Sequence, residues 1–426
     1  MEENFILGPS QHAYRKWKST QTDWADIDAT IQKATDNGKF VGLLLIDMSA
    51  AFNLVAKEVI IPKLMELGVG PYAAKLLHTY LTSRKSRTKV KGVYSAWINV
   101  RTGIGEGSVL GPLIFILTIV CCTMVLHRAA QRLKSLNYTA EVQRDTTVTK
   151  SQIILSSAEF ADDVTGLTVC QTEDQVAMSL TIMMEEYKKY FSAHGLKINV
   201  SKCEHMVIGG QRTRQIIING RAEAQSVKLL GLTFTNHYKF DKHVDTVGEK
   251  MARRNGELAK LSGLADQQTM KMLANATVLS IASFGSHVYA TNVKQQNRIQ
   301  VKINKAMRLI TASKLRVHIA DLQKMTGWLK FTEMVMVSKI TLLHKIMITS
   351  AAPVCKLMIT EAPSQTRYST RDREIKVAWR PKMQTRGAIS FIQTAVKLYN
   401  QIKIVGKKVP NRSLSKFIRS AIKSWR

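Results

Sequence analysis

Residues 157–165, S-A-E-F-A-D-D-V-T, place two adjacent carboxylates, Asp162 and Asp163, behind an aromatic residue and inside a β-prone segment. Neighbouring like charges destabilise a strand or turn unless a positive charge lies beside them. A bound divalent cation supplies that charge, because hard cations take oxygen ligands. The flanking residues 158–160 and 164–169 predict two strands, so both acids are expected on the tight turn of a hairpin.

A third carboxylate stands at the end of another predicted strand. Residues 41–46, V-G-L-L-L-I, are a short continuous apolar run of the kind that is buried on both faces of a sheet, and Asp47 follows directly. If this strand lies in the same sheet as the hairpin, the three carboxylates converge on one edge. Such a set binds two Mg²⁺ ions about 4 Å apart and supports nucleotidyl transfer. An Asp-Asp pair alone, however, is usually a solvated turn.

The charge of the chain predicts a polyanionic partner. The 426 residues include 62 Lys and Arg against 31 Asp and Glu, which gives a formal net charge of +31. The hydrophobic content of 45% is that of a packed globular protein. Because the basic residues are spread from Arg15 to Arg426 among apolar runs, nucleic acid is favoured over its rival, an anionic membrane.

The cysteines and the N-terminus favour an intracellular protein that is not secreted. Five cysteines form no C-x-x-C pair and have no His at zinc-knuckle spacing, so neither a disulfide framework nor a structural zinc site is predicted. The first residues, M-E-E-N-F, lack the features of a signal peptide. Residues 109–126 are apolar for long enough to span a membrane, but they include Gly111 and Pro112, and a buried segment of a large core is the favoured alternative.

The order of predicted elements indicates an α+β fold over residues 1–236. Helical periodicity over residues 60–80 and 172–194 predicts two helical regions, the second of which should cover the sheet. Residues 127–150 are polar and are interpreted as an insertion or a surface loop. Besides the strands already given, strands are predicted at residues 153–155, 197–199, 205–208 and 228–234.

Helical spacing dominates the rest of the chain. Residues 237–350 predict an all-helical domain, in which apolar side chains recur at positions such as Val244, Val247 and Met251. Residues 351–426 form a strongly basic segment with one amphipathic stretch at residues 414–422.

Five blocks of sequence occur in a fixed order: L-L-L-I-D-M-S-A-A-F-N (43–53), G-E-G-S-V-L-G-P-L-I-F (105–115), F-A-D-D (160–163), G-L-K-I-N-V-S-K-C-E (195–204) and K-L-L-G-L-T-F (228–234). Their order resembles the reverse transcriptases of non-long-terminal-repeat (LINE-type) retrotransposons, particularly the jockey-like and CR1-like groups. Residues 11–20, Q-H-A-Y-R-K-W-K-S-T, are similar to the signature ahead of the first palm strand. The resemblance implies a right-hand polymerase: partial fingers and palm in residues 1–236, a helical thumb-like domain in 237–350, and a basic C-terminal segment in 351–426.

The resemblance also implies the roles of the reacting residues. Asp47, Asp162 and Asp163 would hold two Mg²⁺ ions and catalyse RNA-directed DNA synthesis. Phe52 stands where the family keeps an aromatic gate against the ribose 2′-hydroxyl, and Lys202 matches a proton donor to pyrophosphate.

Further residues are implied to contact the substrates, which are an RNA template, a DNA primer and deoxynucleoside triphosphates. They are Glu106, Gly107 and Ser108 for the nucleotide, Leu230 and Gly231 for a primer grip, and Arg84, Lys85, Arg87 and Lys89 for the nucleic-acid backbone. The expected setting is a nuclear or cytoplasmic ribonucleoprotein without a membrane.

Two departures from the family pattern lie near the nucleotide site. The family usually has P-Q-G where this chain has Gly105-Glu106-Gly107, and an Asp where it has Asn53. Both are interpreted as point changes of a degenerating copy. Because the chain begins just before the first palm strand, without most of the fingers and the family's upstream endonuclease, weak or no polymerase activity is expected of it. The alternative function is a non-catalytic nucleic-acid-binding remnant of the same fold.

Overall fold

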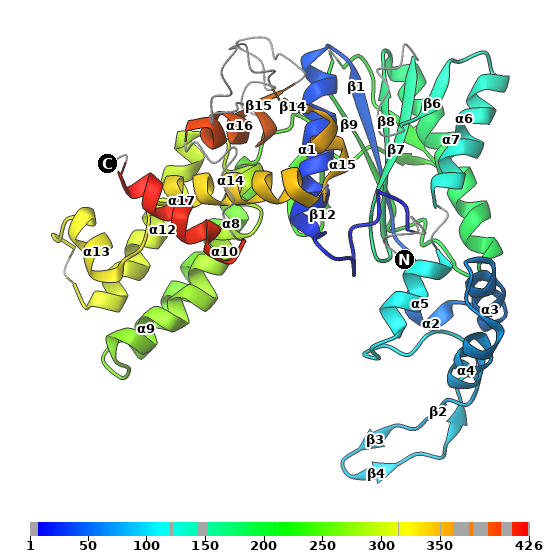
Figure 1. Cartoon of the computed structure of the whole chain (residues 1–426), viewed down its shortest axis with the longest axis horizontal. Helices are drawn as coiled ribbons and strands as arrows, with labels where there is room; N and C mark the ends of the chain where they lie inside the picture. Colours follow the sequence, from blue (N-terminus) through cyan, green and yellow to red (C-terminus); the bar gives the residue numbers. More distant parts are fainter. Residues whose placement is uncertain are drawn as a thin grey trace, which may run out of the picture. The chain divides into compact units, whose positions relative to one another are not determined.

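The computed structural model describes residues 7–119, 122–143, 152–210, 212–313, 315–349, 351–361, 375–377, 391–401 and 411–424 (Figure 1). The chain divides into two compact units. The first contains residues 1–23 and 38–225, and the second contains residues 24–37 and 226–426. The prediction placed a boundary after residue 236, whereas the second unit begins at residue 226 and also contains residues 24–37. Described parts of residues 351–426 share a core with other residues of the second unit.

A five-stranded sheet in the order β6-β7-β8-β1-β9 forms the centre of the first unit. Its strands are β1 (Phe40–Ile46), β6 (Ala140–Val142), β7 (Ile153–Phe160), β8 (Asp163–Cys170) and β9 (Glu204–Ile208). Strand β1 lies between β8 and β9 and is antiparallel to both, whereas β6 and β7 are parallel. The apolar run of β1 is explained by this central position, in which side chains on both faces are buried.

Most predicted strands are confirmed, with two differences. Residues 197–199 contribute one isolated bridge, between Ile198 and Met48, in place of a strand. Residues 228–234 belong to a hairpin of two strands, β12 (Ser226–Leu229) and β13 (Leu232–Thr235), which lies in the second unit. Pattern alone does not separate a short strand from a single bridge, because both alternate apolar and polar residues.

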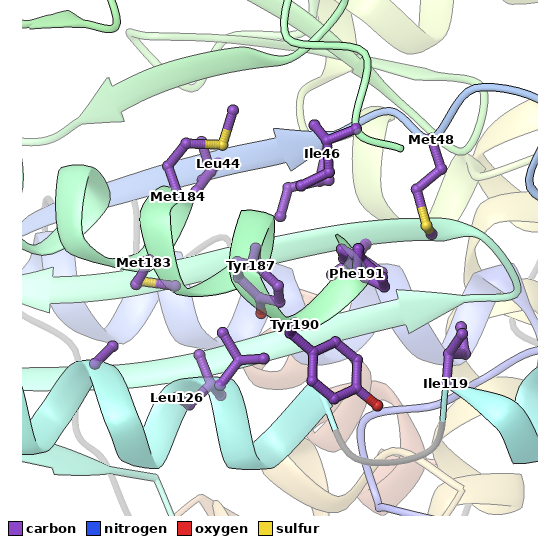
Figure 2. Close-up of a cluster of buried hydrophobic side chains, with 14 of the residues drawn as sticks. Leu44, Ile46, Met48, Ile119, Leu126, Met183, Met184, Tyr187, Tyr190 and Phe191 are labelled. Carbon is purple, nitrogen blue, oxygen red and sulfur yellow. The ribbon is translucent and has the colours of Figure 1, made fainter. Parts of the chain in front are cut away.

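Helix α7 (Glu173–Ala193) packs on the sheet, as predicted, and begins with a capping box between Thr172 and Gln175. Figure 2 shows Tyr187 and Phe191 of this helix in one buried cluster with Leu44 and Ile46 of β1. The close approach depends on Gly42 of β1, because a Cβ there would lie 2.7 Å from the Val176 side chain and 2.8 Å from that of Thr168.

The interpretation of residues 127–150 as a surface loop is wrong for residues 127–135 and 140–142. Helix α6 (Cys122–Ser135) and strand β6 occupy residues 122–135 and 140–142, while residues 144–151 lie outside the described residues. The helix was missed because its outer face is basic, with Arg128, Arg132 and Lys134, and this polarity hides a narrow inner stripe. The buried side chains of that stripe are Val125, Leu126, Ala129, Ala130 and Leu133.

Shorter elements complete the first unit. The helices are α2 (Ala51–Leu54), α3 (Lys57–Glu66), α4 (Pro71–Thr82) and α5 (Gly111–Thr118). Two-residue ladders join β2 (Lys85–Ser86) to β5 (Ile98–Asn99), β3 (Lys89–Val90) to β4 (Val93–Tyr94), and β10 (Ile217–Ile218) to β11 (Arg221–Ala222). The helical pattern of residues 60–80 is broken between α3 and α4, where Gly68 adopts a φ of 92° and Pro71 opens the next helix.

One stretch, Gly111–Ser135, is long and apolar enough to cross a membrane by length and composition alone, and it runs over residues outside the described set. Within the protein, 67% of its apolar window is buried. Phe115 of α5 and Leu126 of α6 belong to the core of the first unit. The apolar residues of this stretch therefore contribute to internal packing, in agreement with the favoured interpretation of residues 109–126.

The second unit is mainly helical, as predicted for residues 237–350. Its helices are the larger part of α1 (Thr20–Asp36), α8 (Asp241–Leu261), α9 (Gln267–Ala274), the π-helical turn Asn275–Leu279, α10 (Ser280–Ser283), α11 (Ser286–Tyr289), α12 (Val293–Thr311), α13 (Ile319–Thr326), α14 (Phe331–Thr349), α15 (Pro353–Leu357), α16 (Phe391–Gln401) and α17 (Asn411–Ser424). Strands β14 (Ile359–Glu361) and β15 (Ile375–Val377) pair in this unit. Helices α14, α16 and α17 share one core with Ala25 and Ala29 of α1.

Candidate active site

The three predicted acids lie at one edge of the sheet, where β1 ends and the β7–β8 hairpin turns. Ile46 pairs with Val164, and Phe160 pairs with Asp163 across the turn. Because Asp47 follows Ile46 directly, the antiparallel register sets it beside Asp163. Backbone pairing therefore brings together acids that are far apart in the sequence.

The three carboxylates interact electrostatically. Burial raises the pKa of the Asp162 carboxyl, and the charge of Asp47 raises it further. Although the Asp163 residue as a whole is exposed, partial desolvation of its carboxyl also raises its pKa, and the charges of Asp162 and Asp47 add to this shift. Both shifts oppose the ionised form, so a cation that binds among these groups would relieve a repulsion that is built into the fold.

The carboxylates fit a Mg²⁺ site that is completed by other ligands. Among the described residues, no group of three or more His, Cys, Asp or Glu side chains is placed so that it alone could hold a metal ion. Asp47 and Asp162 are half-buried and Asp163 is exposed, which leaves room for water and phosphate oxygens. Mg²⁺ is usually bound through one or two carboxylates together with waters and substrate phosphates, and seldom by an all-protein cage. The oxygen donors and their openness therefore suit this ion.

A buried glutamine fixes the backbone of the hairpin turn. Ala161 lies in the left-handed region with a φ of 57°, a conformation that costs a residue with a side chain about 1 kcal/mol. The Gln11 Oε1 atom accepts hydrogen bonds from the backbone N–H of Ala161 at 3.1 Å and of Ala13 at 2.9 Å. Because Ala161 immediately precedes Asp162, Gln11 positions the peptide that carries the two acids.

Residues 10–12 also pair with the end of β7. The Glu159 N–H donates to the Ser10 carbonyl at 3.0 Å, and the His12 N–H donates to the Glu159 carbonyl at 2.7 Å. The Glu159 carboxyl accepts hydrogen bonds from the hydroxyls of Ser10 and Ser157, and burial raises its pKa. The sequence alone does not predict these contacts of Gln11, Ser10 and Glu159, because contacts across such a separation leave no periodic signal.

Lys202 lies on a turn that is attached to the backbone of the first acid. Asn199 donates its N–H to the Asp47 carbonyl at 2.9 Å, and Lys202 donates its own N–H to the Asn199 carbonyl at 2.9 Å. The Cys203 thiol accepts from the Asp47 N–H at 3.4 Å. The Lys202 side chain is exposed, so its ammonium group is free to approach a bound ligand near Asp47.

Phe52 is fixed in place by contacts with neighbouring residues. Its ring stacks on Phe115 with a centroid distance of 4.4 Å and an interplanar angle of 17°, and its carbonyl accepts from the Ile104 N–H at 2.7 Å. Gly103 allows its backbone to approach that of residues 52–53, because a Cβ at position 103 would lie 2.5 Å from the Asn53 carbonyl oxygen. The aromatic ring is thus placed rigidly and remains half-buried.

The two departures from the family pattern are in direct contact. Asn53 Nδ2 donates to Glu106 Oε1 at 2.7 Å. The family's Asp and Gln at these positions also comprise one carboxylate and one amide, so this chain exchanges the two groups and keeps a donor facing an acceptor. The contact is compatible with a paired exchange, and the interpretation of both residues as point changes of a degenerating copy stays a prediction.

Other residues of the 105–115 block support the loop. Ser108 Oγ donates to the Gly105 carbonyl at 2.7 Å and accepts from the Gly111 N–H at 3.0 Å, so its hydroxyl helps to start α5. Gly107 has a φ of 73° and is exposed. The Gly107 backbone remains open to a ligand, whereas the Ser108 hydroxyl is already used within the loop.

A double-mutant cycle tests the exchange. Asn53→Asp alone should lower thermal stability and any polymerase rate, because it sets a second carboxylate against Glu106. The double substitution Asn53→Asp with Glu106→Gln restores an amide donor and should recover most of both losses. A coupling of about 1 kcal/mol is expected for a contact pair of this kind. Strict additivity of the two single changes would show that the contact has no energetic role.

The four basic residues expected at the nucleic-acid backbone do not share one environment. Lys85, Arg87 and Lys89 are exposed on the short ladders. Arg84 differs, because its guanidinium donates to the carbonyl of Gly103 and to that of Leu81 at 3.4 Å, and its side chain is half-buried. Arg84 therefore supports the loop before Gly105, and its contact with the nucleic-acid backbone stays a prediction.

Leu230 and Gly231, the expected primer-grip residues, form the two-residue turn between β12 and β13 in the second unit. Their φ values of 47° and 94° match the mirror-image turns that join twisted strands. Trp24 Nε1 donates to the Leu229 carbonyl at 3.2 Å, and the Phe284 ring would lie 3.0 Å from a Cβ at position 231. The turn is therefore supported closely and requires glycine there.

Comparison with known proteins matches the first half of the chain to one family. The family model described as reverse transcriptase (RNA-dependent DNA polymerase) covers residues 3–234, more than half of the chain. The probable RNA-directed DNA polymerase from transposon BS of Drosophila melanogaster is 26% identical over 323 residues, or 73% of this chain and 33% of that protein. The RNA-directed DNA polymerase from mobile element jockey of the same species is 20% identical over 301 residues, or 68% of this chain and 31% of that protein.

The chain spans about a third of the length of these curated relatives. Among solved structures, apo telomerase from Candida tropicalis matches 96% of this chain and 57% of that chain at 10% identity, with a TM-score of 0.39. A similarity at that level adds nothing to the assignment, which depends on the family match.

Proposed function

Because this chain belongs to the reverse transcriptase (RNA-dependent DNA polymerase) family, we propose that it copies an RNA template into DNA by two-metal nucleotidyl transfer, as the polymerase region of a LINE-type retrotransposon protein. The observation that carries this proposal is the register of β1 against β8, which sets Asp47 beside the Asp162-Asp163 turn. The raised pKa values of Asp162 and Asp163 support a site that is completed by cations.

The carboxylates of Asp47, Asp162 and Asp163 would hold the divalent ions, which supply activation of the attacking hydroxyl and neutralisation of the triphosphate charge when bound. Gln11 keeps the turn in place, so the acids need little rearrangement. Lys202, exposed on the turn tied to Asp47, would protonate the leaving pyrophosphate.

Recognition of the substrates would fall to the surrounding residues. Phe52, fixed by its stacking on Phe115, would exclude a ribose 2′-hydroxyl, while the exposed backbone at Gly107 and the Asn53–Glu106 pair would border the nucleotide. The β12–β13 turn would grip the primer. In this proposal the palm is the first unit and the second unit supplies the thumb, and the basic surface holds the phosphates of an RNA–DNA hybrid without reading sequence. Such a protein would work within an intracellular ribonucleoprotein.

Primer extension tests this function. Oligo-dT annealed to poly-rA should be extended with dTTP in the presence of Mg²⁺, at the weak rate expected of this chain, and the products should disappear on removal of Mg²⁺ or in Asp162→Ala. Binding of the template–primer that weakens with salt but leads to no incorporation would instead support the alternative, a nucleic-acid-binding protein without turnover. Template–primer binding measured in the same samples separates an inactive protein from one that has lost its substrate.

A further inference from the structure

An exposed arm extends from helix α4 in the first unit (Figure 1). We define it as the β-arm, residues 85–99, in which the ladders pair Lys85 with Asn99 and Lys89 with Tyr94. Every residue of the β-arm is exposed. A two-stranded ribbon of this kind has no core of its own, so exposed Val, Tyr, Trp and Ile side chains on it mark a surface for a partner.

The β-arm lies in a part of the chain that carries positive charge alone. Residues 67–105 contain seven Lys or Arg and no Asp or Glu. Chains with mixed surface charge gain solubility from both signs, so a stretch of this length without an acid favours a negatively charged partner. A polyanion fits this charge, whereas a protein partner with a basic surface does not.

One face of the β-arm combines cations with aromatic rings. The guanidinium carbon of Arg87 lies 3.8 Å from the ring centroid of Tyr94 and 4.5 Å from that of Trp97, and the Lys89 ammonium lies 5.0 Å from Tyr94. Despite these contacts, Tyr94 is 48% exposed and Trp97 is 58% exposed. Exposed rings beside guanidinium planes are the surface on which unpaired bases stack.

A cationic cavity of about 750 Å³ lies at the base of the β-arm. Its charged lining residues are Lys57, Lys85 and Arg101 against one acid, Glu58, and His78 also lines it. Because Lys85 belongs to both the cavity and the β-arm, the cations of the cavity lead directly to the aromatic face. Phosphates in the cavity and bases on the rings would then belong to one continuous strand.

We propose that the β-arm binds single-stranded RNA, with bases stacked on Tyr94 and Trp97 and phosphates held by Lys85, Arg87 and the cavity. In a duplex the bases are stacked on each other and present only phosphates and groove edges to such a ribbon, so the rings discriminate in favour of unpaired strands. This inference deepens the proposed function, because copying RNA requires an unpaired template, but its test measures binding and not synthesis.

The experiment compares the binding of a fluorescent 20-nucleotide oligo-U with that of a blunt RNA–DNA hybrid, by fluorescence anisotropy without Mg²⁺. Trp97→Ala should weaken oligo-U binding about tenfold, because the stacking of one base on an aromatic side chain changes the binding affinity by about this factor. Binding of the hybrid should change less than about twofold, and Trp97→Phe should restore most of the oligo-U affinity. Arg87→Ala should lower the slope of log affinity against log salt by about 1.

Tyr72→Ala is the matched control, since Tyr72 is an 87% exposed aromatic on α4 within the same acid-free stretch. It should leave both affinities unchanged. Equal losses for oligo-U and hybrid in Trp97→Ala, or losses no larger than in Tyr72→Ala, would overturn the inference. A change of oligomeric state in Trp97→Ala with RNA binding intact would assign the β-arm to a second copy of the chain and also overturn it.

The outcome is separable from that of the proposed function. Selective loss of oligo-U binding in a protein that shows no primer extension would support the β-arm and contradict the polymerase. Primer extension by the protein, together with oligo-U binding that Trp97→Ala leaves unchanged, would support the polymerase and contradict the β-arm inference.

Discussion

Asp163→Asn should reduce RNA-templated DNA synthesis by at least about 10³-fold, because the stabilisation that metal ions give to a transferring phosphoryl group is several kcal/mol. Asparagine keeps the size of the side chain and removes the charge that attracts the cations. The measurement is the rate of primer extension on an RNA template. Asp174→Asn, at an exposed acid in the first turn of α7, is the control and should leave the rate unchanged.

Asp163→Asn should leave the metal-free protein at least as stable as the wild type. Folding raises the pKa of Asp162 and Asp163, so the unfolded chain releases their protons at lower pH than the folded protein does. The stability of the metal-free protein therefore falls as pH rises from the ordinary carboxyl range through the raised values. At neutral pH Asp163→Asn removes one source of this penalty. A clear loss of metal-free stability would mean that Asp163 serves the fold instead.

Gln11→Ala should lower both the rate and the stability, although Gln11 carries no charge and is 3% exposed. Two buried N–H groups, of Ala161 and Ala13, would lose their acceptor, at about 1–3 kcal/mol each in the free energy of unfolding. Displacement of the acid turn by about 1 Å should reduce the rate about 100-fold. The loss is expected in kcat rather than in KM for the template–primer, because the turn holds the acids.

Gln175→Ala separates positioning from general destabilisation. Gln175 closes the capping box of α7 and is also buried, so its removal should cost about 1 kcal/mol of stability. Because Gln175 touches no part of the acid turn in the described contacts, the rate measured well below the unfolding temperature should be retained. A rate loss in Gln175→Ala equal to that in Gln11→Ala would remove the positioning role from Gln11.

The sequence alone was sufficient to predict the strands that carry the three acids. A continuous apolar run ending in Asp47 and two alternating segments around Asp162 are local patterns, and each formed the predicted strand. Antiparallel pairing of those strands then determines which residues meet at the edge of the sheet. The position of the three candidate acids was thus accessible from short-range pattern together with family resemblance.

Contacts between side chains distant in sequence were not accessible in the same way. The hydrogen bonds of Gln11 to Ala161 and of Asn53 to Glu106 join positions whose individual identities carry no periodic signal. Helix α6 was missed for a related reason, since its polar face outweighs a narrow buried stripe. The contact between Asn53 and Glu106 keeps an amide donor facing a carboxylate acceptor, and neither residue's identity alone predicts it.

The central claim is that Asp47, Asp162 and Asp163 share divalent cations, and a Mg²⁺ titration of thermal unfolding at pH 7.5 tests it without requiring turnover. Ligand binding to the folded state stabilises by about 2.7 kcal/mol at one hundred times Kd. We predict that the unfolding midpoint of the wild type rises with Mg²⁺ and that this rise is absent in Asp163→Asn. No rise in the wild type, or an equal rise in Asp163→Asn, would contradict the claim.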